Sequence, residues 1–117
     1  MSSRLVRLKK LLAVQEQLKA LHEIRRAGFV AEAVSARQEA SDLVDHFNAS
    51  ETMSALFPDV YHRRVGAALA REEANRGMAE KEASRLATAT ARTNMVERSY
   101  REARMEDARL TLSLIHI

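Results

Sequence analysis

Apolar residues recur at intervals of three and four along most of the chain. In the first part of the sequence they form one stripe, flanked by Val14 and Ile24: Leu8, Leu11, Leu18 and Leu21. Further on, the steps alternate between four and three without interruption at Phe29, Ala33, Ala36, Ala40, Leu43 and Phe47. An average repeat of 3.5 residues keeps one face of a helix toward a partner helix. The pattern predicts a helix over residues 4–47, with a phase slip between Leu18 and Phe29 that would place His22 and Arg25 on the seam.

The second half of the chain has the same spacing. Its clearest seam positions are Leu86, Ala89, Thr93, Val96, Tyr100, Ala103, Asp107 and Leu110. The same register, extended toward the N-terminus, gives Val65, Ala68, Glu72, Asn75, Ala79 and Glu82. Pro58 is well suited to the first turn of a helix, because the amide hydrogen it lacks has no partner there. We therefore predict a second helix over residues 58–110, with a small and polar seam at its beginning.

A polar stretch separates the two helices. It contains Asn48, Ser50, Thr52 and Ser54, whose side chains compete for backbone hydrogen bonds, and Pro58 disfavours helix in Phe57 before it. We predict a turn over residues 48–57. Two helices with one short connection bury their seams most simply by folding back on each other. The predicted fold is all-α, an antiparallel two-helix coiled-coil hairpin over residues 1–111, and a homodimer of extended helices is the alternative.

The last six residues, 112–117, differ from the rest of the chain. They read Leu-Ser-Leu-Ile-His-Ile and contain no acid, lysine or arginine, although charge is frequent elsewhere. The string also resembles the conceptual translation of a transposase adapter used in sequencing libraries. We interpret residues 112–117 as a non-native tail, and a frayed apolar C-terminus is the alternative.

The composition fits a long helix and excludes several classes of site. Hydrophobic residues make up 46% and charged residues 30% of the chain, with three Gly, one Pro and no Cys. The absence of Cys excludes disulfides, thiol catalysis and Cys-ligated zinc. No apolar run approaches the roughly 20 residues of a membrane span. We expect a cytoplasmic protein that is peripheral to a membrane at most.

Positive charge gathers at the beginning of the chain. Arg4, Arg7, Lys9 and Lys10 precede the first acid, Glu16. Acids and bases interleave beyond that point, as they do on a solvated helix face. Aromatic residues that could stack on bases are absent from the basic stretch, so we expect no nucleic-acid partner. These four residues are the candidate protein-binding site, and the alternative is that they only solvate a helix end.

The sequence contains no recognisable catalytic, cofactor or metal motif. No two of its histidines have the spacing of three or four that places two ligands on one helix face. His46 and His62 flank the predicted turn and could approach each other, but they lack an obvious third ligand. Gly-rich phosphate loops and nucleophile-elbow motifs are also missing. We expect no enzymatic activity, no cofactor and no metal.

The N-terminal sequence is similar to that of a known family. Residues 3–11, Ser-Arg-Leu-Val-Arg-Leu-Lys-Lys-Leu, lead into a long heptad helix and resemble the N-terminus of FliJ-type flagellar export proteins. The order of long helix, polar turn and longer helix also resembles that family. The resemblance implies an accessory of the flagellar type III export apparatus that contacts the export ATPase ring, the export gate and substrate chaperones. Only the basic residues Arg4, Arg7, Lys9 and Lys10 carry a role over from it. A generic coiled-coil scaffold or adaptor without a role in secretion is the alternative function, and a basic helical protein associated with nucleic acid is a third.

Overall fold

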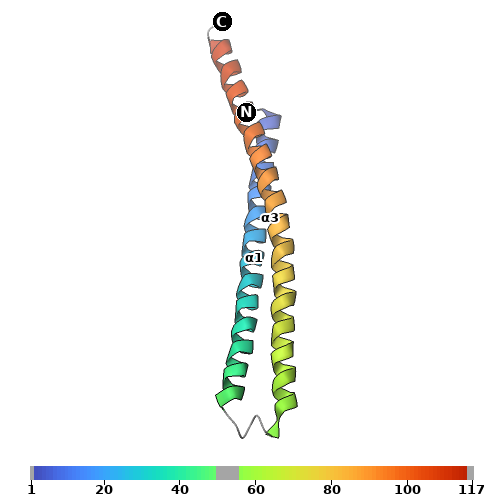
Figure 1. The fold of residues 1–117 in the computed structure, drawn as a ribbon. Helices are drawn as coiled ribbons and strands as arrows, with labels where there is room; N and C mark the ends of the chain where they lie inside the picture. The colour runs from blue at the N-terminus through green and yellow to red at the C-terminus, as the bar shows by residue number, and fades with distance from the viewer. Residues whose placement is uncertain (1, 50–55, 116–117) are drawn as a thin grey trace. The chain divides into compact units, whose positions relative to one another are not determined.

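The computed structural model describes residues 2–49 and 56–115, and it contains two long helices. Helix α1 spans Ser3–Ala49, and helix α3 spans Pro58–Ile115 (Figure 1). No strand occurs in the described residues. The predicted all-α helical hairpin is therefore confirmed. Most of the predicted turn, residues 50–55, lies outside the described part of the chain.

The beginning of each helix follows from its local sequence. The Ser2 hydroxyl accepts a hydrogen bond from the backbone N–H of Leu5 at 3.1 Å, which satisfies one of the free amides of the first turn of α1. Pro58 begins α3, and Asp59 places a negative charge in its first turn, where the helix dipole favours one. Pro58 thus acts as the sequence predicts.

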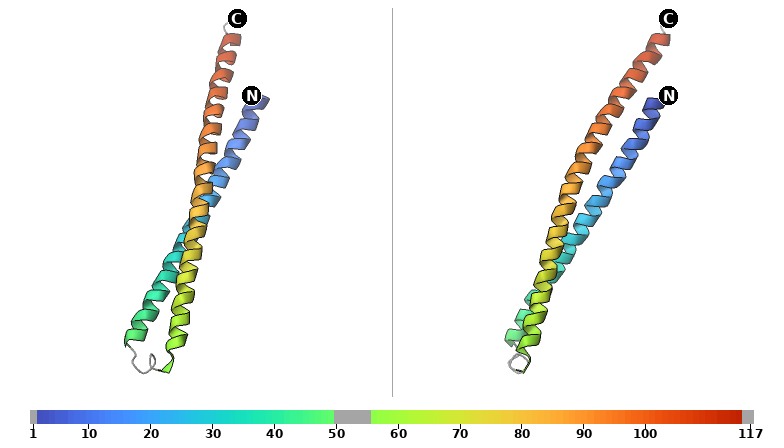
Figure 2. Two further views of the ribbon diagram at one scale, coloured as in Figure 1. Left: turned by 45° about the vertical axis from the view of Figure 1, so that its right-hand side comes forward. Right: turned by 90° about the vertical axis from the view of Figure 1, so that its right-hand side faces the viewer.

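The chain divides into two compact units. We call Ile24–Ala83 the turn unit, and the combination of Met1–Glu23 and Ser84–Ile117 the terminal unit. Each unit contains one segment of α1 and one segment of α3 that run antiparallel (Figure 2). The two units are described separately below.

In the turn unit, the two helices bury a seam of mostly small side chains. On α1 the buried positions are Ala33, Ala36, Ala40 and Leu43, and on α3 they are Tyr61, Ala68, Ala79 and Glu82. Alanine allows two helix backbones to approach closely but removes little apolar area from water. Ion pairs join the helices beside this seam, with 2.6 Å between Arg71 and Glu39 and 3.9 Å between Arg37 and Glu72. The predicted seam over residues 29–47 is correct.

In the terminal unit, the seam contains fewer buried apolar side chains than in the turn unit. Its buried side chains are Leu5 on α1 and Ala89, Thr93 and Ala103 on α3. The Thr93 hydroxyl donates to the Ala89 carbonyl at 2.7 Å, which satisfies it within α3 itself. Arg4 lies 3.7 Å from Glu106, so the beginning of α1 lies beside the C-terminal part of α3, as an antiparallel pair requires.

The predicted seam of the first half of α1 is correct for Leu8 and His22 and wrong for Leu11, Leu18, Leu21 and Arg25. The side chains that turn toward α3 there are Leu5, Leu8, Leu12, Gln15, Lys19 and His22, which are buried or partly buried. Leu11, Leu18 and Leu21 are instead about 40% exposed. From His22 to Phe29 is one heptad, so the register of α1 continues without the predicted phase slip, and Arg25 is exposed. The stripe that is apolar throughout, Leu11 to Leu21, is not the one that α3 covers, because the helix keeps the phase of its alanine seam.

Both helices extend further than predicted. Helix α1 continues to Ala49 rather than ending at Phe47, and α3 continues to Ile115 rather than ending at residue 110. No Gly or Pro interrupts the end of α3, and the Thr111 hydroxyl donates to the Asp107 carbonyl one turn earlier. Leu110, predicted as a seam residue, is 60% exposed. The end of α3 is therefore helical without being packed.

Candidate functional site

The four basic residues of the candidate site occupy the first turns of α1, and all four are exposed. Successive residues of an α-helix are separated by about 100° around its axis. Arg4, Arg7 and Lys10 consequently share an arc of about 120°, whereas Lys9 lies about 100° beyond Lys10. The structure brings three of the four predicted residues together, and we call Arg4, Arg7 and Lys10 the basic cluster.

One member of the basic cluster already has an acidic neighbour. The Arg4 guanidinium lies 3.7 Å from the Glu106 carboxylate, and both side chains are more than half exposed. An exposed pair of this kind contributes about 0–1 kcal/mol to stability. A small groove of about 180 Å³ adjoins it, lined by Ser2, Arg4, Ala103, Glu106, Asp107 and Leu110. The pair leaves the Arg4 side chain accessible to a partner.

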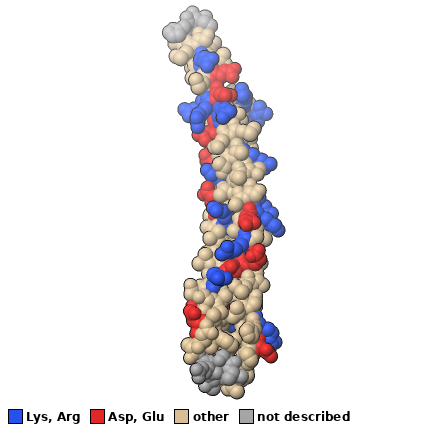
Figure 3. Space-filling model, in the orientation of Figure 1, with Lys and Arg blue, Asp and Glu red and all other residues tan. Residues whose placement is uncertain are grey.

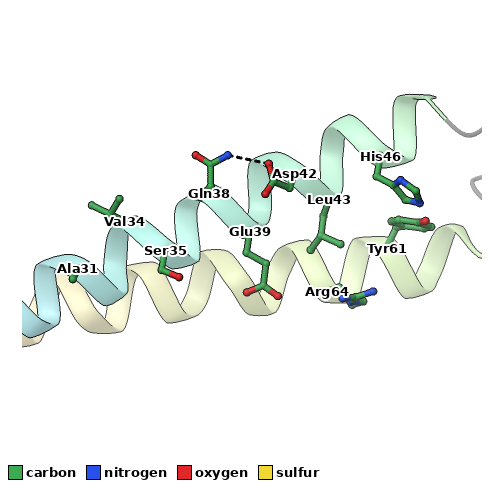
Figure 4. A pocket seen from close by; sticks show the side chains of 10 residues that line it. All are labelled: Ala31, Val34, Ser35, Gln38, Glu39, Asp42, Leu43, His46, Tyr61 and Arg64. Carbon is green, nitrogen blue, oxygen red and sulfur yellow. Dashed lines mark hydrogen bonds between the residues drawn. The ribbon is translucent and has the colours of Figure 1, made fainter.

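A larger groove lies in the turn unit and was not predicted. It has a volume of about 1300 Å³ and is lined by Ala31, Val34, Ser35, Gln38, Glu39, Asp42, Leu43, His46, Tyr61 and Arg64 (Figure 4). The Gln38 amide donates to the Asp42 carboxylate at 2.9 Å along one wall. Eight of the ten residues come from α1, so the groove is a broad open surface of one helix rather than an enclosed pocket.

Aromatic rings gather at the end of the turn unit next to the predicted turn. The Phe47 ring packs edge-on against Tyr61, with 5.3 Å between centroids, and lies 5.7 Å from the His62 ring. His46 lies 5.9 Å from Tyr61. Phe47 therefore lies close to the beginning of α3, as an antiparallel hairpin requires. His46 and His62 both contact aromatic rings, and no group of three potential metal ligands occurs among residues 2–49 and 56–115.

Several hydroxyl and carboxylate groups of α3 are engaged in contacts within the helix itself. Thr88 and Thr111 donate to the carbonyl four residues earlier, as Thr93 does. Arg101 pairs with Glu97 one turn away on α3, and Arg76 lies 3.7 Å from Glu72 in the same arrangement. On the face seen in Figure 3, acidic and basic groups alternate along the helices with uncharged surface between them.

One further surface was not predicted, because the pattern placed most of its residues on the seam. Leu11, Val14, Leu18 and Leu21 form a line on α1 in the terminal unit, and each is 39–50% exposed. The signal that could have identified it is the second stripe, Leu5, Leu8 and Leu12, which runs beside the first and continues in phase with Phe29. A helix with two adjacent apolar stripes can cover only one of them with a single partner helix.

Comparison with protein-family models, with curated proteins and with solved structures finds no match to the chain. Neither of the two described helices has a stretch long and apolar enough to cross a membrane.

Proposed function

We propose that this chain is a non-enzymatic coiled-coil accessory of the flagellar type III protein export apparatus. In this proposal the basic cluster and Lys9 contact the export ATPase, and other surfaces of the hairpin contact the export gate and substrate chaperones. The protein would work in the cytoplasm, at the inner face of the membrane when it is bound to the gate. The observation that carries the proposal is the exposed basic start of α1, within the residues 3–11 that resemble FliJ-type proteins.

A basic helix end is suited to such a role for electrostatic reasons. Arg7 and Lys10 project from α1 more than one turn before its first acid, Glu16. A concentrated positive end is attracted to an acidic opening of a ring-shaped partner, which speeds encounter and fixes orientation more than it adds affinity. Contacts of this kind require neither a pocket nor a cofactor.

A generic coiled-coil scaffold is the alternative, and one observation favours it. Glu106 partly offsets the charge of Arg4, so the basic residues could serve only to solvate the end of the terminal unit. The two functions differ in what reversal of the charges does to binding.

The test is a titration against the flagellar export ATPase from the same genome, at low and moderate salt. The variant Arg4→Glu, Arg7→Glu, Lys10→Glu should bind at least about tenfold more weakly, with the largest loss at low salt. Its helicity should be retained, because acids suit the positive end of the helix dipole. Lys9→Glu is the matched control and should have a smaller effect per charge, since Lys9 lies apart from the other three. Binding that is unchanged by the triple substitution, or absent from the parent chain, would remove the case for an export role.

A further inference from the structure

The terminal unit leaves a line of four apolar side chains on α1 uncovered. Leu11, Val14, Leu18 and Leu21 are 42%, 50%, 39% and 40% exposed, while the seam positions between them include Gln15 and Lys19. We call these four residues the leucine stripe. Adjacent exposed apolar residues in a line, unlike single ones, indicate an interaction surface.

The spacing of the leucine stripe matches a helix as its partner. Its steps of three, four and three keep the 3.5-residue period of a coiled-coil seam, and it covers about 15 Å of helix at 1.5 Å per residue. A groove of about 200 Å³ runs beside Leu18 and continues onto α3, where Ser84, Arg85, Thr88 and Arg92 line it. Met95, one heptad after Thr88 on α3, adds an apolar side chain that is 69% exposed. A third helix could lie against the stripe and this groove.

The charges around the stripe indicate which charge the partner helix carries. Arg7 follows the line of the stripe at its N-terminal end, Lys10 lies next to it, and Arg85 and Arg92 line the groove on the α3 side. Three acids of the terminal unit lie away from the stripe, whereas Glu102 and Glu106, which pairs with Arg4, lie further along α3 than the residues of the groove. Glu16, Glu23 and Glu97 line a separate groove together with Lys19 and Thr93, and Glu16 and Glu23 lie on the side of α1 opposite the stripe.

We propose that the leucine stripe is a docking site for an amphipathic helix of another protein, with an apolar heptad face and acidic flanks. Its apolar face would cover the leucines, and its carboxylates would face Arg7, Lys10 and Arg92, in the manner of helix-in-groove recognition. A second copy of this chain would bring an equally basic stripe onto the first, so charge disfavours self-pairing through this surface. The heptad period of the stripe and its width of a single line of side chains fit a partner helix, whereas a lipid surface requires no such period. The leucines of the stripe are not part of the basic cluster, although Arg7 and Lys10 border both surfaces, and the proposal does not depend on an export ATPase.

The test uses the full chain and a synthetic peptide of about three heptads, with Leu at the a and d positions and Glu at the flanking e and g positions. A matched peptide carries Lys in place of every Glu. Fluorescence anisotropy of the labelled peptides should show binding of the acidic peptide, with the basic peptide at least about tenfold weaker. Equal binding of both peptides, or no binding of the acidic one, would overturn the proposal.

Variants of the chain locate the site. Leu11→Gln with Leu18→Gln should weaken binding of the acidic peptide about tenfold or more, because apolar contacts at the centre of an interface carry most of its affinity. Val30→Gln with Val34→Gln is the matched control, since these valines are exposed on α1 but belong to the turn unit. Arg92→Glu offers a second test that leaves the leucines in place, and it should weaken binding in a salt-dependent way. Circular dichroism should show unchanged helicity for each variant, and equal losses in the control pair would contradict the assignment.

Two other occupants of the stripe would give different results. Sedimentation of the parent chain would reveal a dimer that Leu11→Gln with Leu18→Gln dissociates, if a second copy covered the stripe. Flotation with vesicles of phosphatidylcholine and phosphatidylserine would reveal lipid binding that the same variant loses. Either result without binding of the acidic peptide would overturn the proposal. Loss of peptide binding together with retained ATPase binding by this variant would support the docking site and the proposed function separately.

Discussion

At the scale of single residues, Gln15 is the clearest departure from an apolar seam. It lies on the line of α1 that faces α3 in the terminal unit, between Leu12 and Lys19. Its side-chain oxygen is buried, and it has no hydrogen-bond partner among the described residues. A buried polar group without a partner costs about 1–3 kcal/mol of stability. Polar seam residues are tolerated in coiled coils where they select one register or partner.

We therefore predict that Gln15→Leu stabilises the protein by about 1 kcal/mol, because it removes the unpaired amide and adds apolar area to the seam. Thermal or urea unfolding followed by circular dichroism measures the change. Gln17→Leu is the control, since Gln17 is exposed and its replacement should have almost no effect. A loss of stability in Gln15→Leu would show that the amide is satisfied or that the site does not accept a branched side chain.

At the scale of the helices, the sequence predicted α3 better than the first half of α1. The positions from Val65 to Asp107 that continue the three-and-four spacing are all buried or partly buried, because only one stripe of α3 has that phase. The first half of α1 has two adjacent apolar stripes, and the sequence favoured the one over Leu11, Leu18 and Leu21, which α3 does not cover. Which stripe is covered depends on the partner helix, and that is a tertiary property that the periodicity of one helix does not contain.

The residues of the candidate site could be predicted from the sequence, but which of them lie together could not. Charge order along the chain identified Arg4, Arg7, Lys9 and Lys10, yet the separation of Lys9 and the pairing of Arg4 with Glu106 require the helix positions and the antiparallel register. The leucine stripe escaped prediction for the same reason that the seam was misassigned. Exposed leucines cannot be told from buried ones until the partner face is known.

The C-terminal end of α3 gives a prediction of its own. Leu112, Leu114 and Ile115 are helical but between 56% and 73% exposed, so they contribute little packing to the terminal unit. Removal of residues 112–117 should shift the melting temperature by no more than about 2 °C, because surface changes away from packed features are usually within about 0.5 kcal/mol. Calorimetry of the shortened chain measures this. A larger drop would show that these residues pack in solution, and it would contradict our interpretation of a non-native tail.

At the scale of the whole molecule, the two units are stabilised differently. The turn unit has a buried alanine seam closed at one end by the rings of Phe47 and Tyr61, and charge pairs join its two helices. The terminal unit has a seam interrupted by Gln15, and its leucine stripe is uncovered. Its two chain segments are also separated in sequence by the entire turn unit, so bringing them together costs more loop-closure entropy when the turn unit is unfolded. Local opening occurs most readily where fewest apolar contacts hold an element.

We predict that backbone amides of the terminal unit exchange with solvent faster than those of the turn unit under native conditions. Hydrogen exchange followed by mass spectrometry should show lower protection over residues 8–20 and 90–105 than over residues 33–45 and 63–78, because the terminal unit opens without the turn unit.

The Gln15→Leu variant should slow exchange in the terminal unit only. Saturation with the acidic Leu and Glu peptide should do the same, since a ligand that binds only the closed form protects it by mass action, by about 2.7 kcal/mol at a hundredfold excess over Kd. Uniform protection in both units would instead mean that the helices open as one cooperative unit, and the seam of the terminal unit would then be stronger than its side chains indicate.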